Sequence, residues 1–528
     1  MILTVPALLD QMAGRFADRT AVVTEDRRLT YAELVDEVDR ASRALLARGV
    51  GPGDRVAVWL PNRVEFIVAL LASQRIGAAV VPLNTRYRGP EARAVVERSR
   101  ASALFLAGGF LGTDYRAMLD DPATGMPRSL HTIVDVGDGT GTMTWTEFLR
   151  CGDDVDDFAV RAAVDTVGPD TVADILFTSG TTGRPKGVMS AHRQSLAVAE
   201  TWAQGADMTA DDRYAIVNPF FHSFGYKAGI LPSLLRGATI HPVQTFDADS
   251  LMELVQREHI TVMPGAPTLF ISLINHPRLE EFDLSSLRFA TAGAASVPEN
   301  LFEQMLQVLG FSRVAQAYGL TECVVATQSR PGEDPRHVAQ TTGPAVAGLE
   351  LRIVAPETGQ DRPVGDDGEV LLRGDTVMLG YFEDPEATAE AIDEDGWLHT
   401  GDIGRLDEHG CLKITDRLKD MFTVGGFNVY PAEVENALAE HADVIDVAVV
   451  GVPDDRMGEV GRAFVVLREG VALDRNALTA HCRTHLANFK VPRDFVAEAS
   501  LPRNAAGKVV KTDLDRAQLR RSSTIAIP

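Results

Sequence analysis

The stretch DILFTSGTTGRPKG at 174–187 joins a short apolar run, typical of a buried strand, to a turn rich in Gly, Ser and Thr. Small and hydroxylated residues allow a backbone to close around phosphate oxygens, and a lysine adds positive charge. The turn is not a Walker A loop, because Lys186 follows Pro185 and no Ser or Thr comes next. A plain turn between a strand and a helix is the alternative. We favour a phosphate-binding loop with the candidate contacts Thr178, Ser179, Gly180, Thr181, Thr182, Gly183 and Lys186.

On both sides of this loop, apolar strand-like runs alternate with segments of helical periodicity. RVAVWLP at 55–61 and AAVVPLN at 78–84 precede the loop, and TVMPGAP at 261–267 and LRFATAG at 287–293 follow it. Such alternation is typical of largely parallel sheets with helices on both faces. The sequence therefore predicts an α/β fold.

The pattern changes towards the C-terminal end. From about 345 to 418, short strands and Gly/Asp turns such as DDGEVLLRGD at 366–375 predict an antiparallel β subdomain. Beyond DRLKD at 416–420, strands and helices mix in a smaller segment. We therefore expect a large N-terminal domain at 1–418, which includes the β subdomain, and a small α+β C-terminal domain at 419–528.

Composition and charge exclude several classes of protein. The 528 residues carry 45% hydrophobic and 24% charged side chains, as ordinary soluble globular proteins do. The formal charge of -23 argues against a general nucleic-acid binder, because nucleic-acid phosphates attract basic surfaces. No apolar run of about 18 residues predicts a membrane span, and the four cysteines form no CxxC pair that would indicate a zinc site. We expect a cytoplasmic protein, and its oligomeric state stays open, a homodimer included.

The loop SGTTGRPKG resembles the phosphate loop of the adenylate-forming superfamily, which includes acyl-CoA synthetases, peptide-synthetase adenylation domains and firefly-type luciferases. Further blocks resemble the family in its own order and cover nearly the whole chain: TYAEL (30–34), PLNTRY (82–87), YGLTE (318–322), DGWLHTGD (395–402), DRLKD (416–420), GGFNVYPAEVE (425–435) and LPRNAAGK (501–508). The resemblance implies an AMP-binding acyl-CoA synthetase. Such an enzyme first uses ATP to convert a carboxylate to an acyl-adenylate, with release of pyrophosphate, and then transfers the acyl group to CoA.

The resemblance also implies roles at the nucleotide. Glu322 corresponds to the Mg²⁺ ligand, and Mg²⁺ suits one carboxylate combined with phosphate oxygens and waters. Thr321 would hydrogen-bond the α-phosphate, and Tyr318 would lie against the adenine. Asp402 and Arg417 would hold the ribose hydroxyls. Further contacts by analogy are Gly293, Ala294, Ala295 and Gly319.

Two half-reactions require two arrangements of the C-terminal domain, which the resemblance makes a mobile lid. Lys508 corresponds to the family lysine that bridges the substrate carboxylate and the α-phosphate, a task that suits a point cation on a flexible stem. Lys419 matches the hinge at which the lid rotates between half-reactions. The CoA tunnel would be lined by Gly425, Gly426 and Phe427, because glycines let the thin pantetheine arm pass close to the backbone.

The acyl pocket is assigned by the same resemblance to His222, Phe224, Gly225, Lys227 and Gly319. The helical segment around 221–229 carries no acidic residue, which disfavours an amino-acid substrate. His222 matches a family residue that borders the carboxylate site. Lys227 lies one helical turn beyond it, where it either reaches a polar group of the substrate or CoA, or extends to solvent.

The strings NPFFHSFGYKAGIL (218–231), HRQSL (192–196) and LPRNAAGK resemble the actinobacterial ligases of late cholesterol breakdown. Those enzymes activate the bicyclic indanedione propionate left from the steroid C and D rings. A medium-chain fatty acid CoA ligase and an acyl-AMP ligase that loads a carrier protein are the alternatives. A nucleotide binder without catalysis is disfavoured, because the expected catalytic residues are all present. The implied cofactors are ATP, Mg²⁺ and CoA.

Overall fold

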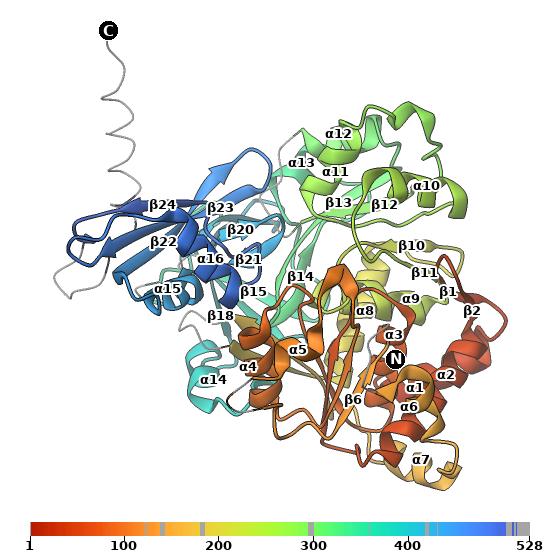
Figure 1. Ribbon diagram of the computed structural model, residues 1–528. Coiled ribbons are helices and arrows are strands. Elements are labelled where there is room, and N and C mark those ends of the chain that lie inside the picture. Colours follow the sequence, from red (N-terminus) through yellow and green to blue (C-terminus); the bar gives the residue numbers. More distant parts are fainter. Residues whose placement is uncertain are drawn as a thin grey trace. The chain divides into compact units, whose positions relative to one another are not determined.

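The computed structural model describes residues 2–121, 123, 125–137, 143–179, 185–293, 300–356, 358–417, 422–429, 431–502, 509, 511 and 514, without the side chains of residues 179, 415–417, 428 and 432. The chain divides into two compact units (Figure 1). The larger unit comprises Met1–Thr85, Ala92–Thr178 and Lys186–Leu418, and the smaller comprises Arg86–Glu91, Ser179–Pro185 and Lys419–Pro528.

The largest sheet has eight strands in the order β17-β9-β8-β4-β3-β5-β6-β7. The pairings that link β8, β4, β3, β5, β6 and β7 are parallel, and the short β17 runs antiparallel to its neighbour β9. Strands β4 and β5 are buried at every position, as expected where helices cover both faces of a parallel sheet. The α/β prediction is confirmed. The strands are β3 (Arg55–Trp59), β4 (Ala79–Pro82), β5 (Ala103–Leu106), β6 (Thr132–Asp135), β7 (Met143–Thr144), β8 (Val172–Ser179), β9 (Pro185–Ala191) and β17 (Gly380–Tyr381).

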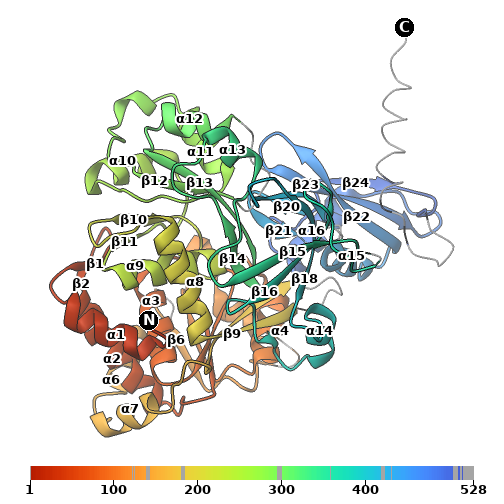
Figure 2. The ribbon, with the colours of Figure 1, turned by 180° about the vertical axis from the view of Figure 1, so that it is seen from behind.

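The helices near the N-terminus pack on this sheet and on one another (Figures 1 and 2). Helix α2 begins at a capping box in which Thr30 and Glu33 satisfy each other's backbone N–H groups. Helix α3 is apolar on all sides, and it is accordingly buried along most of its length between α2 and the sheet. The helices of this part are α1 (Val5–Arg15), α2 (Tyr31–Ala47), α3 (Val64–Arg75), α4 (Gly89–Ser99), α5 (Tyr115–Leu119), α6 (Trp145–Arg150), α7 (Asp157–Val164), α8 (His192–Gly205) and α9 (Leu231–Arg236), with the 3₁₀ turn η1 (Phe110–Gly112) and the π-helix η2 (Phe224–Ile230).

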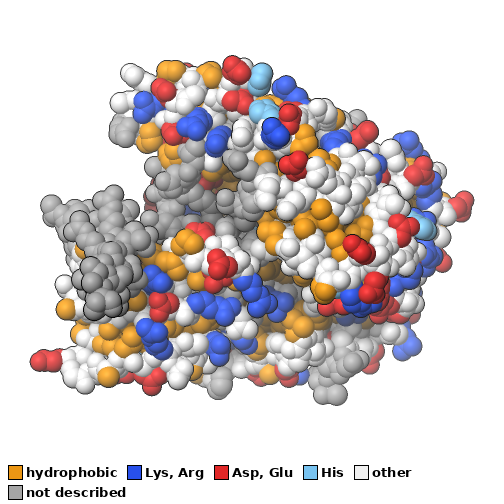
Figure 3. Space-filling view, turned by 90° about the horizontal axis from the view of Figure 1, so that it is seen from above, with side chains coloured by type: hydrophobic (Ala, Val, Ile, Leu, Met, Phe, Trp, Pro, Cys, Tyr) orange, Lys and Arg blue, Asp and Glu red, His pale blue; other side chains and the backbone are white. Residues whose placement is uncertain are grey.

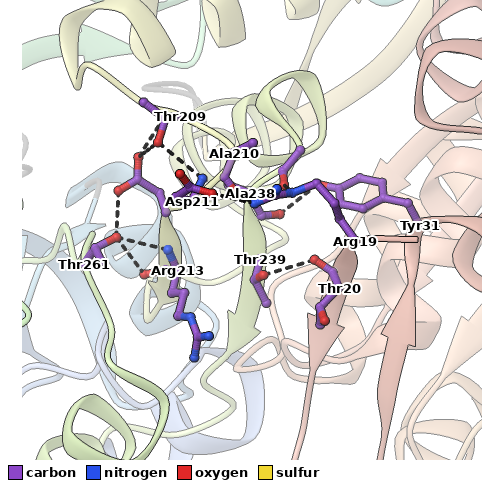
Figure 4. A network of polar contacts seen from close by, with 12 residues as sticks. Arg19, Thr20, Tyr31, Thr209, Ala210, Asp211, Arg213, Ala238, Thr239 and Thr261 are labelled. Atoms are coloured by element: carbon purple, nitrogen blue, oxygen red, sulfur yellow. Dashed lines mark hydrogen bonds and ion pairs between the residues drawn. The ribbon is translucent and has the colours of Figure 1, made fainter. Parts of the chain in front are cut away.

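A second sheet, in the order β10-β11-β1-β2, ties the beginning of the chain to its middle. Figure 4 shows Thr239 donating to the carbonyl oxygen of Thr20 (3.0 Å) and Tyr31 reaching Ala238, whose carbonyl accepts from the Tyr31 hydroxyl at 2.7 Å. The strands are β1 (Thr20–Val23), β2 (Arg28–Thr30), β10 (Arg213–Ile216) and β11 (Thr239–Pro242).

A third sheet, in the order β12-β13-β14, carries the YGLTE motif. The strand predicted over 261–267 is not formed: only isolated bridges occur, at Val262 and Gly265. Pro264 lies between them and has no N–H group for a ladder. The elements are β12 (Phe289–Ala292), β13 (Arg313–Leu320) and β14 (Cys323–Gln328), with α10 (Ala248–Glu258), α11 (Pro267–Ile274), α12 (Leu301–Gln307), α13 (Pro335–Gln340) and the turn η3 (Leu279–Glu281).

An antiparallel sheet, in the order β15-β16-β18-β19, occupies the region from 349 to 417. Its elements are β15 (Leu349–Val354), β16 (Gly368–Gly374), β18 (Leu398–Leu406), β19 (Leu412–Arg417) and helix α14 (Pro385–Ala391). The smaller unit has its own mixed sheet, β21-β20-β23-β22 with β24 beside β23. It contains β20 (Phe422–Val424), β21 (Phe427–Val429), α15 (Pro431–Ala439), β22 (Val444–Asp454), β23 (Gly458–Leu467), α16 (Arg475–His485) and β24 (Asp494–Ala497).

On the face shown in Figure 3, Lys and Arg side chains stand among Asp and Glu side chains. Within the described residues, no helix is long and apolar enough to cross a membrane.

Candidate active site

Strands β8 and β9 form the two stems of the predicted phosphate loop. Thr178 at the end of β8 donates from Oγ1 to the carbonyl oxygen of Lys186 on β9, at 3.5 Å. The Lys186 ammonium lies 4.9 Å from the centre of the Tyr381 ring, a cation–π distance. Gly180, Thr181, Thr182 and Gly183, and the side chain of Ser179, lie outside the described residues, so their phosphate contacts stay predictions.

Glu322 occupies the tight connection between β13 and β14. Its Oε1 accepts a hydrogen bond of 2.7 Å from the Tyr381 hydroxyl, and its carbonyl oxygen accepts one of 2.8 Å from the Met378 N–H. Burial raises the pKa of Glu322, while the Tyr381 hydroxyl and the charge of Lys186 act in the opposite direction. Tyr381 is a site residue that the sequence did not reveal, because it lies in a two-residue strand outside every recognised motif.

Gly319 is required by the geometry of the same hairpin. A Cβ atom at this position would lie 2.5 Å from the Val325 nitrogen and 3.0 Å from the Cys323 carbonyl oxygen. The pairing of β13 with β14 shifts register here, which brings the two backbones together. The close approach explains the glycine, and its contact with the nucleotide or the acyl chain stays a prediction.

Tyr318 and Asp402 meet although they come from different sheets. The Tyr318 hydroxyl donates to Asp402 Oδ2 at 2.6 Å, and Asp402 is only 7% exposed. Asp402 on β18 also faces Arg417 on β19 in the strand register, although the Arg417 side chain is not described. The two residues predicted at the adenine and the ribose are therefore held by one hydrogen bond.

Gly293 follows β12 and is half-buried. A Cβ atom there would lie 3.4 Å from the Ala317 carbonyl oxygen, an ordinary contact, so no neighbour among the described residues requires a glycine. Ala294 and Ala295 lie outside the described part of the chain. The contact of Gly293, Ala294 and Ala295 with the nucleotide stays a prediction.

His222 precedes η2 and is exposed to solvent. The protein around the ring removes part of its hydration, and this desolvation lowers the pKa of His222 below its ordinary value. The Phe224 N–H donates to His222 Nδ1 at 3.2 Å. A neutral ring with Nδ1 as acceptor carries its proton on Nε2, where it is available to a carboxylate oxygen.

Comparison with known proteins decides the family. The family described as "AMP-binding enzyme" matches residues 9–382, and "AMP-binding enzyme C-terminal domain" matches residues 433–508. The chain belongs to the AMP-binding enzyme family. A 3-(7a-methyl-1,5-dioxo-octahydro-1H-inden-4-yl)propanoyl:CoA ligase of Mycobacterium tuberculosis (strain ATCC 25618 / H37Rv) is 54% identical, and one of Rhodococcus jostii (strain RHA1) is 51% identical; each alignment covers 97% of this chain and 98% of the relative.

The fold agrees with that of a solved CoA synthetase. The o-succinylbenzoate CoA synthetase of Bacillus subtilis superposes with a TM-score of 0.81 and 28% identity, over 96% of this chain and 98% of that one.

In this AMP-binding enzyme, the segment predicted as a helix around 221–229 is a π-helix from Phe224, whose last turn is closed by a hydrogen bond from the Leu231 N–H to the Tyr226 carbonyl oxygen. Gly225 is required, because a Cβ atom would lie 2.1 Å from the Pro219 carbonyl oxygen. Pro232 has no N–H group to offer the Ala228 carbonyl. That carbonyl accepts instead from the Tyr214 hydroxyl at 3.0 Å.

Lys227 projects from η2 into the core of the AMP-binding enzyme. Its side chain is 2% exposed, its Nζ lies 2.9 Å from Asp174 Oδ1, and it donates to Ser190 Oγ at 2.7 Å. Of the two alternatives for Lys227, extension to solvent is wrong, because its ammonium lies inside the protein beside the Asp174 carboxylate on β8. A contact with the substrate stays a prediction. Asp174, a charged residue within the apolar run before the loop, was the one sequence signal of this pair.

The smaller unit of the AMP-binding enzyme contains Gly425, Gly426 and Phe427, the residues predicted to line a CoA tunnel. Gly425 (φ 55°) and Gly426 (φ 84°) form the two-residue turn between β20 and β21, a turn in which both residues need positive φ. A Cβ atom on Gly425 would lie 2.7 Å from Met457 Cε. The Phe427 ring stacks on Phe489 with 4.7 Å between centroids. Lys419 and Lys508, predicted as the hinge and the adenylation lysine, lie outside the described residues.

Proposed function

We propose that this AMP-binding enzyme is an ATP-dependent acyl-CoA synthetase that activates a steroid-derived indanedione propionate. A carboxylate and ATP give acyl-AMP and pyrophosphate, and acyl-AMP and CoA then give acyl-CoA and AMP. The observation that carries the proposal is the identity of 54% and 51% to two ligases of the dioxo-octahydroindenyl propanoyl type, over nearly the full length of each chain.

The nucleotide end of the site fits the first half-reaction. The carboxylate oxygen attacks the α-phosphorus and pyrophosphate leaves, so negative charge must be stabilised on both sides of the phosphorus. Lys186 supplies a cation beside the loop stems, Thr321 would hydrogen-bond the α-phosphate, and the Tyr318–Asp402 pair would hold the nucleoside. Lys508 would neutralise the attacking carboxylate and the α-phosphate.

Glu322 fits a Mg²⁺ ion. It offers carboxylate oxygens, the donor that Mg²⁺ prefers, and Tyr381 orients one of them by its hydrogen bond. Bound Mg²⁺ would neutralise phosphate charge, and a cation at this point would offset the burial that raises the pKa of Glu322. On the acyl side, neutral His222 would donate from Nε2 to the carboxylate and orient it for attack.

The second half-reaction needs CoA. The Gly425–Gly426 turn presents backbone without side chains and lies near the stacked Phe427 and Phe489 rings, which suits the passage of a thin pantetheine arm. We keep Lys419 as the proposed hinge between the two arrangements. The cytoplasm is the proposed compartment, since ATP and CoA are supplied there and the four cysteines are free thiols.

A panel of carboxylic acids, assayed by AMP release with and without CoA, tests the proposal. We expect the indanedione propionate to give the highest kcat/KM, with octanoate as the medium-chain reference and a CoA-dependent acyl-CoA product. A higher kcat/KM for octanoate would end the substrate proposal while leaving the reaction type intact. AMP release that no thiol acceptor stimulates, or stimulation only by a phosphopantetheine-loaded carrier protein, would contradict the assignment of free CoA.

A further inference from the structure

One buried ammonium joins three segments that border the candidate active site. Lys227 on η2 lies 2.9 Å from Asp174 Oδ1 on β8 and donates to Ser190 Oγ on β9 at 2.7 Å. The side chains of Lys227 and Asp174 are 2% and 0% exposed. This is the arrangement of a fixed internal contact, because a buried charge is tolerated only where partners compensate it.

The surroundings hold the acidic partner in place. Asp174 Oδ2 accepts a hydrogen bond of 2.8 Å from Ser195 Oγ on α8. Beside it, Gln74 Nε2 on α3 donates to the Tyr226 hydroxyl at 2.6 Å. The Lys227 contact is therefore part of a polar network that spans α3, β8, β9, α8 and η2, and its geometry is fixed from several sides.

The positions of the partners along the chain show which parts of the candidate site the network connects. Asp174 lies four residues before Thr178, and Ser190 lies four residues after Lys186. The Lys227 ammonium therefore contacts both stems of the phosphate loop, β8 through Asp174 and β9 through Ser190. On the third side, Lys227 follows His222 and Phe224, the residues proposed at the substrate carboxylate and acyl chain. A shift of η2 against the stems would change the distance between the carboxylate and the phosphates.

We propose that Lys227 and Asp174 are a positioning pair that sets the register between the acyl-binding segment and the stems of the phosphate loop. The inference rests on the proposed function and deepens it, and it replaces the predicted contact of Lys227 with the substrate: in this proposal Lys227 acts through Asp174 and Ser190. Near-attack geometry depends on such support, since small misplacements of the reacting groups cost large factors in rate.

The variants are Lys227→Met, Asp174→Asn and the double variant, which leaves no unpaired buried charge. Adenylation is followed by ATP–pyrophosphate exchange with the indanedione acid and with octanoate, per folded enzyme molecule. Lys227→Met is expected to lower kcat/KM by about 100-fold for both acids, and the double variant by only about 10-fold, because removing both charges restores a neutral core. The ratio between the two acids should stay within about twofold of wild type.

Two further variants separate the contribution of Ser190 from a general effect of removing a buried hydroxyl. Ser190→Ala removes only the link to β9 and should lower kcat/KM by about threefold. Ser233→Ala is the matched control: its buried hydroxyl donates to the Gly229 carbonyl at 2.8 Å in the same helical segment, away from the loop stems. It is expected to leave kcat/KM unchanged.

Three outcomes would overturn the proposal. A selective loss with the indanedione acid would mean that Lys227 contacts the substrate. Wild-type kinetics in folded Lys227→Met and double variants would mean that the pair is merely structural. Absence of any recovery in the double variant would mean that the two residues do not act as a pair. Failure of the proposed function is a separate result, because it shows in the wild-type enzyme, and the variants can still be compared with whichever acid the wild type activates.

Discussion

The Tyr318 hydroxyl and the Asp402 carboxylate share a hydrogen bond of 2.6 Å across 84 positions of sequence. The bond joins β13, a strand of the YGLTE hairpin, to β18, the strand in which the DGWLHTGD motif ends. Because Asp402 is buried, its orientation depends on the donors that it finds in the protein. The proposed adenine contact and the proposed ribose contact are therefore not independent.

Tyr318→Phe tests this coupling. The variant keeps an aromatic face for the adenine and removes the donor to Asp402, so we expect the KM for ATP to rise about 5- to 10-fold with kcat changed less than about twofold. Tyr31→Phe is the control, because its hydroxyl donates to the Ser233 and Ala238 carbonyl oxygens far along the chain from both motifs. An unchanged KM for ATP in Tyr318→Phe would show that the nucleoside does not depend on this bond.

Tyr381→Phe should change the pH dependence of adenylation. Burial raises the pKa of Glu322, and the Tyr381 hydroxyl counteracts this by stabilising the carboxylate. Activity needs the ionised form, so it is lost as the pH falls through this pKa. Removal of the donor raises the pKa further, and we expect the acidic limb of the kcat/KM profile to move to higher pH.

Glu322→Gln is the reference for the pH profile of Tyr381→Phe, because it removes the ionising carboxylate itself. It should lower adenylation at least about 10²-fold, about 2.7 kcal/mol of barrier, and raise the Mg²⁺ requirement. An acidic limb in Tyr381→Phe that coincides with the wild-type limb would show that another group controls it. Normal kinetics of Glu322→Gln at limiting Mg²⁺ would make the carboxylate structural.

The family motifs gave a predicted set of nucleotide contacts, of which the structure brings Tyr318 and Asp402 together, and the α/β class followed from alternating strand and helix patterns. Contacts made by residues outside the motifs were not predictable. Tyr381 reaches Glu322 from a two-residue strand, and Asp174 meets Lys227 only because β8 and η2 pack together in the folded chain. The segment 261–267 has the composition of a strand, but its central proline prevents a ladder.

Lys508→Ala should separate the two half-reactions. Adenylation needs the lysine between the carboxylate and the α-phosphate, whereas thioester formation starts from an anhydride that no longer needs it. We expect ATP–pyrophosphate exchange to be abolished, while much of the acyl-CoA formation from a supplied acyl-adenylate remains. Lys419→Pro should show the reverse, with acyl-adenylate formed and acyl-CoA output lost. Equal loss of both half-reactions in folded Lys508→Ala would contradict its assignment.

His241 makes the stability of the larger unit depend on pH. The side chain is 1% exposed on β11, and among the described residues neither ring nitrogen has a hydrogen-bond partner. Desolvation lowers its pKa to about 4, from the 6.5 of an exposed histidine. Between pH 6.5 and pH 4, His241 is protonated in the unfolded chain but stays neutral in the folded chain. Its contribution to the free energy of unfolding is therefore fully present above about pH 6.5 and is lost as the pH falls towards 4. At pH 5 this costs about 2 kcal/mol.

His241→Leu removes the buried base and should reduce that loss. We expect the melting temperature of the variant to fall less between pH 8 and pH 5 than that of the wild type, because leucine has no proton to exchange. His409→Gln is the matched control, since the His409 side chain is 66% exposed and should leave the pH dependence unchanged. His192, buried with its pKa also lowered to about 4, remains in the variant, so the pH dependence should shrink without vanishing. A variant as sensitive to acid as the wild type would show that His241 is protonated or hydrated in the folded enzyme.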